Sequence, residues 1–368
     1  MKQKFCIADL NAIETRVGAW VAQCDSLMDV FRKGRDPYLD FAVKMSGIPY
    51  EKLYADYKSK NDAVKAAAKA WRQLAKPGVL GAIYRLSGGG WGWSKKAYKD
   101  HALDCDANEV NENGKKVGKK FCKCPEVRDR IKVGLWGYAE NMGVSMTQEE
   151  ANMVVRVFRE AYQEICGIPN RSTGFAGGIW YILEDAVKDV LAEDAVNVVR
   201  TVGPNGCIRI DKLNIIERVD GEENKRNILR IQLPSGRYLH YIDARIENTL
   251  MPWKDGEGND VYRPALVYAG INQDTKQWEN YVTSHGGKIF ENIVQGIARD
   301  FLAEKLLRID ALGIQIVAHV HDEGVGLTAN SPLAPGYHEM EQIMGQPVLW
   351  APGLPLSAEG FESAYYHK

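Results

Sequence analysis

The sequence lacks an apolar run of the roughly 18 residues that a membrane-spanning helix requires. Its first residues, Met1 to Lys4, are not followed by the apolar stretch of a secretory signal. A disulfide framework is also missing from the pattern, because the seven cysteines are odd in number and irregularly spaced. Together these absences favour an intracellular protein with no membrane partner.

A strong net charge is absent as well, since the formal charge at pH 7 is -1. The charge is nevertheless unevenly distributed. Residues 58–132 contain 18 Lys and Arg against 8 Asp and Glu, a net of about +10 that leaves about -11 elsewhere. A phosphate-binding region joined to an acidic, metal-binding region fits this pattern. The alternative is a solvated basic loop that has no partner.

What is present indicates a globular protein that mixes helices and strands. The length of 368 residues predicts two domains. A short buried strand is expected over Phe5–Leu10, with Asp9 at its C-terminal end. The other expected elements are helices over Ile13–Val30, Asn61–Tyr84, Thr147 to about Ile165, Trp180–Ala192 and Gly287–Leu312, a hairpin joining Ile228–Leu233 to Tyr238–Ile242, and a strand Ile314–Val320 that returns over Val325–Thr328 through the turn His321–Gly324.

Local signals set several helix boundaries. Asp36 before Pro37 is a typical N-cap with proline at the first helical position. Thr147 followed by Glu150 forms a capping-box pattern. Pro77 is expected to loosen the helix Asn61–Tyr84, because its nitrogen cannot donate to the carbonyl four residues earlier.

Two acidic positions at strand ends are the first candidates for chemistry. Asp9 ends the N-terminal strand, and Asp322 and Glu323 occupy the turn near the C-terminus. Partly buried carboxylates require a counter-charge, and hard oxygen ligands suit Mg²⁺. Two such ions can clamp the attacking and leaving oxygens of a phosphoryl transfer. The alternative is that these acids lie in exposed turns and bind nothing.

A second candidate is the series Arg72, Lys76, Leu80 and Tyr84, which repeats at four-residue spacing. Residues at this spacing share one face of an α-helix. Two cations followed by an apolar and an aromatic residue can hold a triphosphate and stack a base. The alternative is an amphipathic core helix whose basic side chains extend to solvent.

With these segments in view, the sequence resembles the family A, DNA polymerase I-like DNA polymerases. Asp9–Arg16 (DLNAIETR) resembles motif A, Arg72–Tyr84 (RQLAKPGVLGAIY) resembles motif B, and Val320–Glu323 (VHDE) resembles motif C. Gln295 matches the glutamine of the palm helix between motifs B and C. The amino-acid sequences of these segments are closest to those of bacteriophage-encoded members. The resemblance covers nearly the whole chain except about residues 88–133.

The resemblance implies an α+β fold and an activity. The fold would be a palm, an antiparallel sheet with flanking helices, formed by residues 1–30 and 198–368. Mostly helical fingers would be inserted over residues 31–197, including a basic Cys/His module at about 88–133. The implied activity is template-directed addition of dNTPs to a primer 3′-hydroxyl by two-metal phosphoryl transfer, in replication or repair. The expected location is the host cytoplasm.

The resemblance also implies roles for single residues. Asp9, Asp322 and the Leu10 carbonyl would hold two Mg²⁺ ions, with Mn²⁺ as a substitute, and Glu323 would be an auxiliary acid. Glu14 would exclude ribonucleotides, and Lys76 would also donate a proton to pyrophosphate. The residues expected to bind the dNTP are Glu14, Tyr38, Arg72, Lys76, Leu80 and Tyr84. Those expected to contact primer or template are Arg16, Arg85, Gln295 and His321.

Some positions depart from the family pattern. Leu80 replaces an aromatic residue that influences discrimination at the sugar 3′ position, and Arg85 replaces a glycine. Motif A begins close to Met1, so a thumb and a 3′–5′ exonuclease are expected from a second chain, unless the chain is a fragment or a reduced core. His101, Cys105, Cys122 and Cys124 are candidate zinc ligands, with free thiols as the alternative.

Two other functions remain open on these residues. A single-subunit RNA polymerase also has motifs of the A and B type. Glu14 and the VHDE form of motif C nevertheless favour DNA synthesis. A non-catalytic template-binding subunit of a split polymerase is the other alternative. The presence of both Asp9 and Asp322 favours catalysis over that reading.

Overall fold

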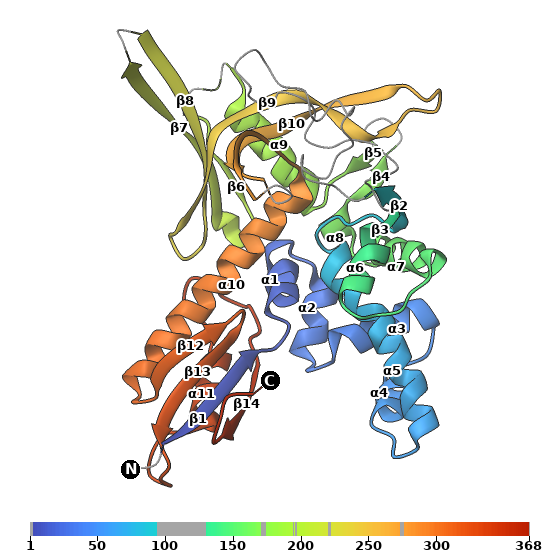
Figure 1. Cartoon of the computed structure of the whole chain (residues 1–368), viewed down its shortest axis with the longest axis vertical. Helices are drawn as coiled ribbons and strands as arrows, with labels where there is room; N and C mark the ends of the chain where they lie inside the picture. The colour runs from blue at the N-terminus through green and yellow to red at the C-terminus, as the bar shows by residue number, and fades with distance from the viewer. Residues whose placement is uncertain are drawn as a thin grey trace, which may run out of the picture. The chain divides into compact units, whose positions relative to one another are not determined.

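The computed structural model of the chain describes residues 3–93, 130–170, 174–193, 195, 197–219, 222–272 and 276–367. The backbone divides into two compact units (Figure 1). The first unit contains residues 1–40, 162–267 and 283–368, and the second contains residues 41–161 and 268–282. Antiparallel sheets and helices make up both, so the expected mixture of helix and strand is confirmed.

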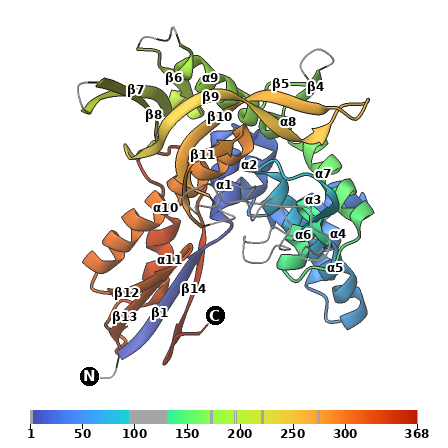
Figure 2. The same cartoon turned by 45° about the horizontal axis from the view of Figure 1, so that its top comes forward.

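A four-stranded antiparallel sheet in the first unit joins the two ends of the sequence. Its strand order is β12–β13–β1–β14. The strands are β12 (Gln315–Val320), β13 (Glu323–Ala329), β1 (Gln3–Leu10) and β14 (Ala358–Ser363). Helices α10 (Gly286–Ala311) and α11 (Tyr337–Gly345) pack along this sheet, as both views show (Figure 2). The predicted N-terminal strand and C-terminal hairpin are therefore confirmed and are neighbours.

Glycine allows the two helices to approach strand β13 closely. A Cβ atom on Gly324 would lie 2.8 Å from Leu306 Cδ2 of α10 and 2.8 Å from Met340 Cε of α11. Strand β1 is buried over Cys6, Ile7 and Ala8. The sheet end that carries the acidic residues is thus supported by packing from both helices.

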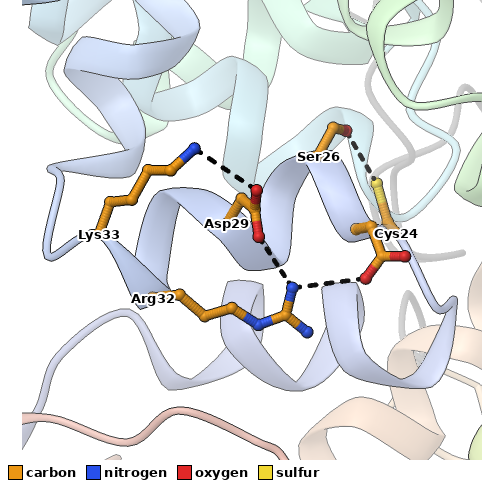
Figure 3. A network of polar contacts seen from close by, with 6 residues as sticks. Cys24, Ser26, Asp29, Arg32 and Lys33 are labelled. Atoms are coloured by element: carbon orange, nitrogen blue, oxygen red, sulfur yellow. Dashed lines mark hydrogen bonds and ion pairs between the residues drawn. The ribbon is translucent and has the colours of Figure 1, made fainter.

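The predicted helix over Ile13–Val30 is wrong as a single element. The chain forms α1 (Ile13–Val21) and α2 (Asp25–Arg32), separated by Gln23 in the left-handed conformation with φ 54°. At the start of α2, Cys24 Sγ lies 3.5 Å from Ser26 Oγ. On its exposed side Asp29 accepts from Arg32 at 2.8 Å and from Lys33 at 3.4 Å (Figure 3). The polar contacts lie on the exposed side of α2, while Leu27, Met28, Val30 and Phe31 form its buried apolar side.

A six-stranded antiparallel sheet with order β11–β10–β9–β8–β7–β6 lies beside helix α9 (Ile179–Leu191), which packs on β6 to β9. The strands are β6 (Arg200–Val202), β7 (Ile208–Val219), β8 (Glu222–Gln232), β9 (Tyr238–Lys254), β10 (Asp260–Ile271) and β11 (Trp278–Ser284). The predicted hairpin is confirmed as β8–β9, with Leu229 opposite Tyr241. Smaller elements of this region are the 3₁₀ turn η4 (Pro204–Gly206), helix α8 (Gln163–Cys166) and the strand pair β4 (Ile168–Asn170) and β5 (Gly174–Ala176).

The second unit is mostly helical among its described residues. Its elements are the end of α3 (Pro37–Ser46), α4 (Tyr50–Tyr57), α5 (Asp62–Pro77), the π-helix η1 (Gly78–Ala82), α6 (Gly134–Asn141), α7 (Gln148–Ala161), the paired strands β2 (Gly89–Trp93) and β3 (Arg130–Val133), and the parts of β10 and β11 within residues 268–282. The predicted effect of Pro77 is confirmed, because α5 ends there and continues as a wider π-helical turn.

The predicted helix starts are also confirmed. Asp36 Oδ1 accepts from the backbone nitrogens of Tyr38 at 2.8 Å and Leu39 at 3.0 Å. Thr147 and Glu150 make both hydrogen bonds of a capping box. The described helices include none with the length and apolar character needed to cross a membrane.

Candidate active site

The acidic residues predicted from the two chain ends meet at one edge of the four-stranded sheet. Asp9 of β1 lies directly opposite Glu323 of β13 and, on its other side, opposite Glu359 of β14. The Leu10 nitrogen donates to the Asp322 carbonyl at 3.2 Å, which ties the β12–β13 turn to the end of β1. The structure therefore brings Asp9 and Asp322 together, although they are separated by nearly the entire sequence.

Three acidic residues, Glu323, Asp9 and Glu359, thus occupy neighbouring positions across the strands. Like charges directly opposite each other on neighbouring strands are destabilising. Glu359 was not expected from the sequence, because its place in the row depends on the pairing of β14 with β1. Within the described ranges, no three side chains of His, Cys, Asp or Glu form a group that could hold a metal ion. Any ion here would complete its shell with backbone, water or substrate oxygens.

Backbone conformation fixes the turn that carries Asp322. Val320 pairs with Glu323, so His321 and Asp322 are the two connecting residues, and His321 has a left-handed φ of 54°. Such a conformation is uncommon outside glycine but is tolerated by histidine. His321 is exposed and Asp322 is half-buried. The turn therefore carries two polar side chains, and strand pairing on both sides fixes its backbone conformation.

Glu323 has a partner that sequence reasoning missed. It is only 3% exposed, and its Oε1 accepts a hydrogen bond of 2.9 Å from the Tyr366 hydroxyl. The same hydrogen bond raises the pKa of Tyr366 above its usual value. Tyr366 follows β14 near the end of the chain. The paired tyrosines Tyr365 and Tyr366 were a visible signal, but nothing in the sequence links them to Glu323.

Helix α1 begins directly after β1 and carries two predicted site residues. Glu14 is half-buried in its first turn. Arg16 is buried. It donates to the Asn11 carbonyl at 2.7 Å and the Pro355 carbonyl at 3.0 Å, and burial lowers its pKa to about 10. Its described contacts thus anchor the segment before β14, and its role toward primer or template stays a prediction.

Gln295 is exposed on helix α10. The next residue, Gly296, is buried, and its carbonyl accepts from Arg237 at 2.8 Å. Arg237 also donates to Asp300 at 2.6 Å. The β8–β9 hairpin therefore fixes the helical turn that presents Gln295.

In the second unit, Arg72 and Lys76 lie one turn apart on α5, and both are half-buried. The Arg72 guanidinium lies 5.6 Å from the centroid of the Tyr57 ring on α4. Asn61 caps the helix by accepting from the nitrogens of Ala63 and Val64. The two cations are thus placed on one face by a well-formed helix.

The expected continuation of that face is wrong in one respect. Leu80 lies in the π-helix η1, and Tyr84 and Arg85 lie in the turn that follows it, so the four residues do not share one regular α-helical face. A π-helical turn contains more residues than an α-helical turn, which rotates the positions beyond it. Leu80, Tyr84 and Arg85 are half-buried, and Arg85 has a left-handed φ of 70°.

Two predicted groups remain to be placed. Tyr38 is half-buried in the first turn of α3. The candidate zinc ligands His101, Cys105, Cys122 and Cys124 lie outside the described residues.

Comparison with known proteins supports the resemblance found in the motifs. No protein-family model matches the chain. A DNA polymerase of Bacillus phage SP02 is 42% identical over 144 residues, which is 38% of this chain and 20% of that protein. The chain thus spans only a fifth of the length of this curated relative. Over those residues, similarity to a phage DNA polymerase is confirmed.

A solved structure matches much more of the chain at lower similarity. It is the POL domain of Pol1 from M. smegmatis in complex with DNA primer-template and dNTP. The match has a TM-score of 0.42 and 15% identity, and it covers 98% of this chain and 39% of that one.

Proposed function

We propose that this chain is the catalytic core of a template-directed DNA polymerase of the family A type, adding dNTPs to a primer 3′-hydroxyl. The observation that carries the proposal is the meeting of Asp9 and Asp322 at one sheet edge, each within a segment that resembles a polymerase motif. The similarity to a phage DNA polymerase also supports it.

The residues at the sheet edge fit divalent metal ions of the magnesium type. Asp9 and Asp322 would supply carboxylate oxygens, and the Leu10 carbonyl would supply another. A divalent cation would be attracted to the acidic residues Glu323, Asp9 and Glu359, which lie side by side across the strands. When bound, two Mg²⁺ ions provide charge neutralisation at the α-phosphate and favour ionisation of the primer hydroxyl. Mn²⁺ has the ligand preference to replace them.

The side chains around these acids have positioning roles in the proposal. Glu323, held by Tyr366, would maintain the negative field beside Asp322 without being a principal ligand. Gln295 and His321 are exposed and would contact the primer end. Glu14 would fill the space at the sugar 2′ position, which selects deoxyribonucleotides over ribonucleotides.

In the second unit, Arg72 and Lys76 would bind the triphosphate. Guanidinium and ammonium groups form charge-assisted hydrogen bonds with phosphate oxygens, and their spacing of one helical turn suits adjacent phosphates. Lys76 could also supply a proton to pyrophosphate. Leu80 and Tyr84 would lie toward the base, with Arg85 toward the template and Tyr38 toward the triphosphate.

The names palm and fingers are part of the same proposal. Residues 1–30 and 198–368 would form the palm, and residues 31–197 would form the fingers. A second chain that supplies a thumb and an exonuclease stays a prediction from the sequence.

Primer extension with each class of nucleotide tests the proposal. The expected result is Mg²⁺-dependent extension in which each added dNTP follows the template base, with little use of ribonucleotides. The Glu14→Ala variant should admit ribonucleotides while keeping dNTP use. Extension with ribonucleotides alone would instead support the RNA polymerase reading. Binding of primer-template without extension would support a template-binding subunit.

A further inference from the structure

Strands β2 and β3 form a two-stranded ribbon on which cations and aromatic rings alternate. Lys132 lies opposite Trp91 in the antiparallel register, and Arg130 shares their face because it is two residues away on the same strand. The Arg130 guanidinium lies 5.1 Å from the centroid of the Trp91 ring, and the Lys132 ammonium lies 5.0 Å from that of Trp136. The two rings meet edge to face at 5.0 Å.

Trp91 is exposed in a way that packing alone does not explain. Its side chain is 52% exposed although it is one of the largest apolar groups in the chain. Arg130 and Trp136 nevertheless hold the ring, and the Trp136 indole N–H is fixed by donating to the Met146 carbonyl at 2.9 Å. The exposed ring is therefore held in place before any ligand arrives, which reduces the entropic cost of binding.

Glycines seat the ribbon against α6. A Cβ atom on Gly89 would lie 2.7 Å from Trp136 Cβ, and one on Gly137 would lie 2.3 Å from the Lys132 carbonyl oxygen. Any larger side chain at these two positions would force the ribbon away from the helix. The close approach fixes Trp91, Lys132 and Trp136 as one surface.

The charge of this surface identifies the kind of partner. Arg130 makes no ion pair with any residue in the described part of the chain, whereas Lys132 pairs with Glu140 at 2.7 Å. The ribbon also belongs to the basic stretch of residues 58–132. A cation next to an open aromatic face suits a polyanion that exposes flat rings. Single-stranded nucleic acid has both features, whereas duplex DNA keeps its base faces stacked inside.

We propose that the β2–β3 ribbon binds single-stranded template DNA, with a base stacked on Trp91 and a backbone phosphate held by Arg130. This inference rests on the proposed polymerase function for the identity of the strand. Binding is expected to tolerate any base sequence, because every base has a face that can stack.

The test is the affinity of the full chain for a fluorescent oligothymidylate of about 20 nucleotides, measured by anisotropy without metal or nucleotide. Trp91→Ala should weaken binding about tenfold, and Trp91→Phe should retain most of it, because a single stacked base makes that difference. Arg130→Gln should weaken binding and reduce the slope of log K against log salt by about 0.7. Trp278→Ala, which removes a 59% exposed tryptophan from β11, is the matched control.

Several results would overturn the inference. Equal effects of Trp91→Ala and Trp278→Ala would show that the ribbon is no special surface. An equal loss for single strands and for blunt duplex would contradict base stacking. Unchanged melting temperatures exclude unfolding as the cause of any loss. Because binding is measured without catalysis, absent primer extension would sink the polymerase proposal while leaving the ribbon result intact.

Discussion

The sheet edge of the first unit and helix α5 of the second hold their candidate site residues in different ways. At the sheet edge, Asp9 and Asp322 come from opposite ends of the chain and are joined by backbone pairing. On α5, Arg72 and Lys76 are near in sequence and are placed by one helix. The acids therefore depend on the tertiary fold, whereas the cations depend on local structure.

The difference also appears in how strictly each region is specified. Three features constrain the acidic turn. They are the left-handed backbone of His321, the close packing of Leu306 and Met340 against Gly324, and the hydrogen bond from Tyr366 to Glu323. Helix α5 instead widens into a π-helix just where the residues proposed to contact the base begin. Turns of this kind are frequent at functional sites.

A large effect on catalysis is expected on α5. Arg72→Ala should reduce kcat/KM for the dNTP about 30- to 100-fold, because it removes charge-assisted hydrogen bonds to phosphate. Steady-state primer extension at varied dNTP concentration measures this. Lys69→Ala, an exposed position on the same helix, is the control and should change little. Similar losses in both variants would contradict a specific role for Arg72.

A pH effect of about 3 kcal/mol is expected from the support beneath the sheet. Lys305 of α10 is completely buried, its Nζ donates to the Gln346 carbonyl at 2.5 Å, and burial lowers its pKa from 10.5 to about 8. Between these values the unfolded chain binds a proton that the folded chain does not. The free energy of unfolding therefore rises as pH increases from 8 to 10.5, because the buried Lys305 is neutral there. Below pH 8 Lys305 is protonated in both states, so the cost of burying its charge is present in full.

Urea unfolding of the wild type and of Lys305→Met at several pH values isolates this contribution. The difference between the two proteins should shift in favour of the wild type as the pH is raised. A difference that stays constant across the interval would show that Lys305 keeps an ordinary pKa in the fold.

A smaller effect is expected from the missed partner of Glu323. Tyr366→Phe removes one hydrogen bond and should lower kcat about three- to tenfold while leaving KM for the dNTP nearly unchanged. Tyr365→Phe, at the neighbouring exposed tyrosine, should be close to wild type. A change confined to KM would place Tyr366 in substrate binding instead of in the acidic turn.

The smallest effect is expected at the surface of α2. Arg32→Ala breaks the exposed contact with Asp29, which Figure 3 shows, and the exposed contact with Asp25 at 3.5 Å. Exposed ion pairs contribute little because water and salt screen them. The melting temperature should therefore stay within error of the wild type. A clear drop would show that this network supports the fold more than its exposure suggests.

Local chemistry explains what could be predicted from the sequence. The cap at Asp36, the capping box at Thr147 and the loosening of the helix at Pro77 depend on residues a few positions apart, and all are found. The break between α1 and α2 was missed, because Gln23 carries no obvious signal for a left-handed conformation. The π-helix was also missed, because Pro77 predicts a disturbed helix but not how the backbone continues beyond it.

In the candidate site, too, residues with a local sequence signal could be predicted, whereas residues placed by tertiary structure could not. The motif acids could be named from the sequence because Asp9 and Asp322 each end or follow an apolar strand. Glu359 and Tyr366 could not, because their places depend on β14 pairing with β1, which no local pattern encodes.

In the proposed function, Asp9 and Asp322 jointly hold the catalytic metal ions. The most direct measurement is single-turnover dNTP incorporation by Asp9→Asn and Asp322→Asn variants, together with Mn²⁺ binding followed by electron paramagnetic resonance. The account predicts a loss of about a thousandfold or more in rate and weaker Mn²⁺ binding in both variants, because each loses several kcal/mol of charge stabilisation. Incorporation at the wild-type rate by either variant, with Mn²⁺ binding unchanged, would contradict it.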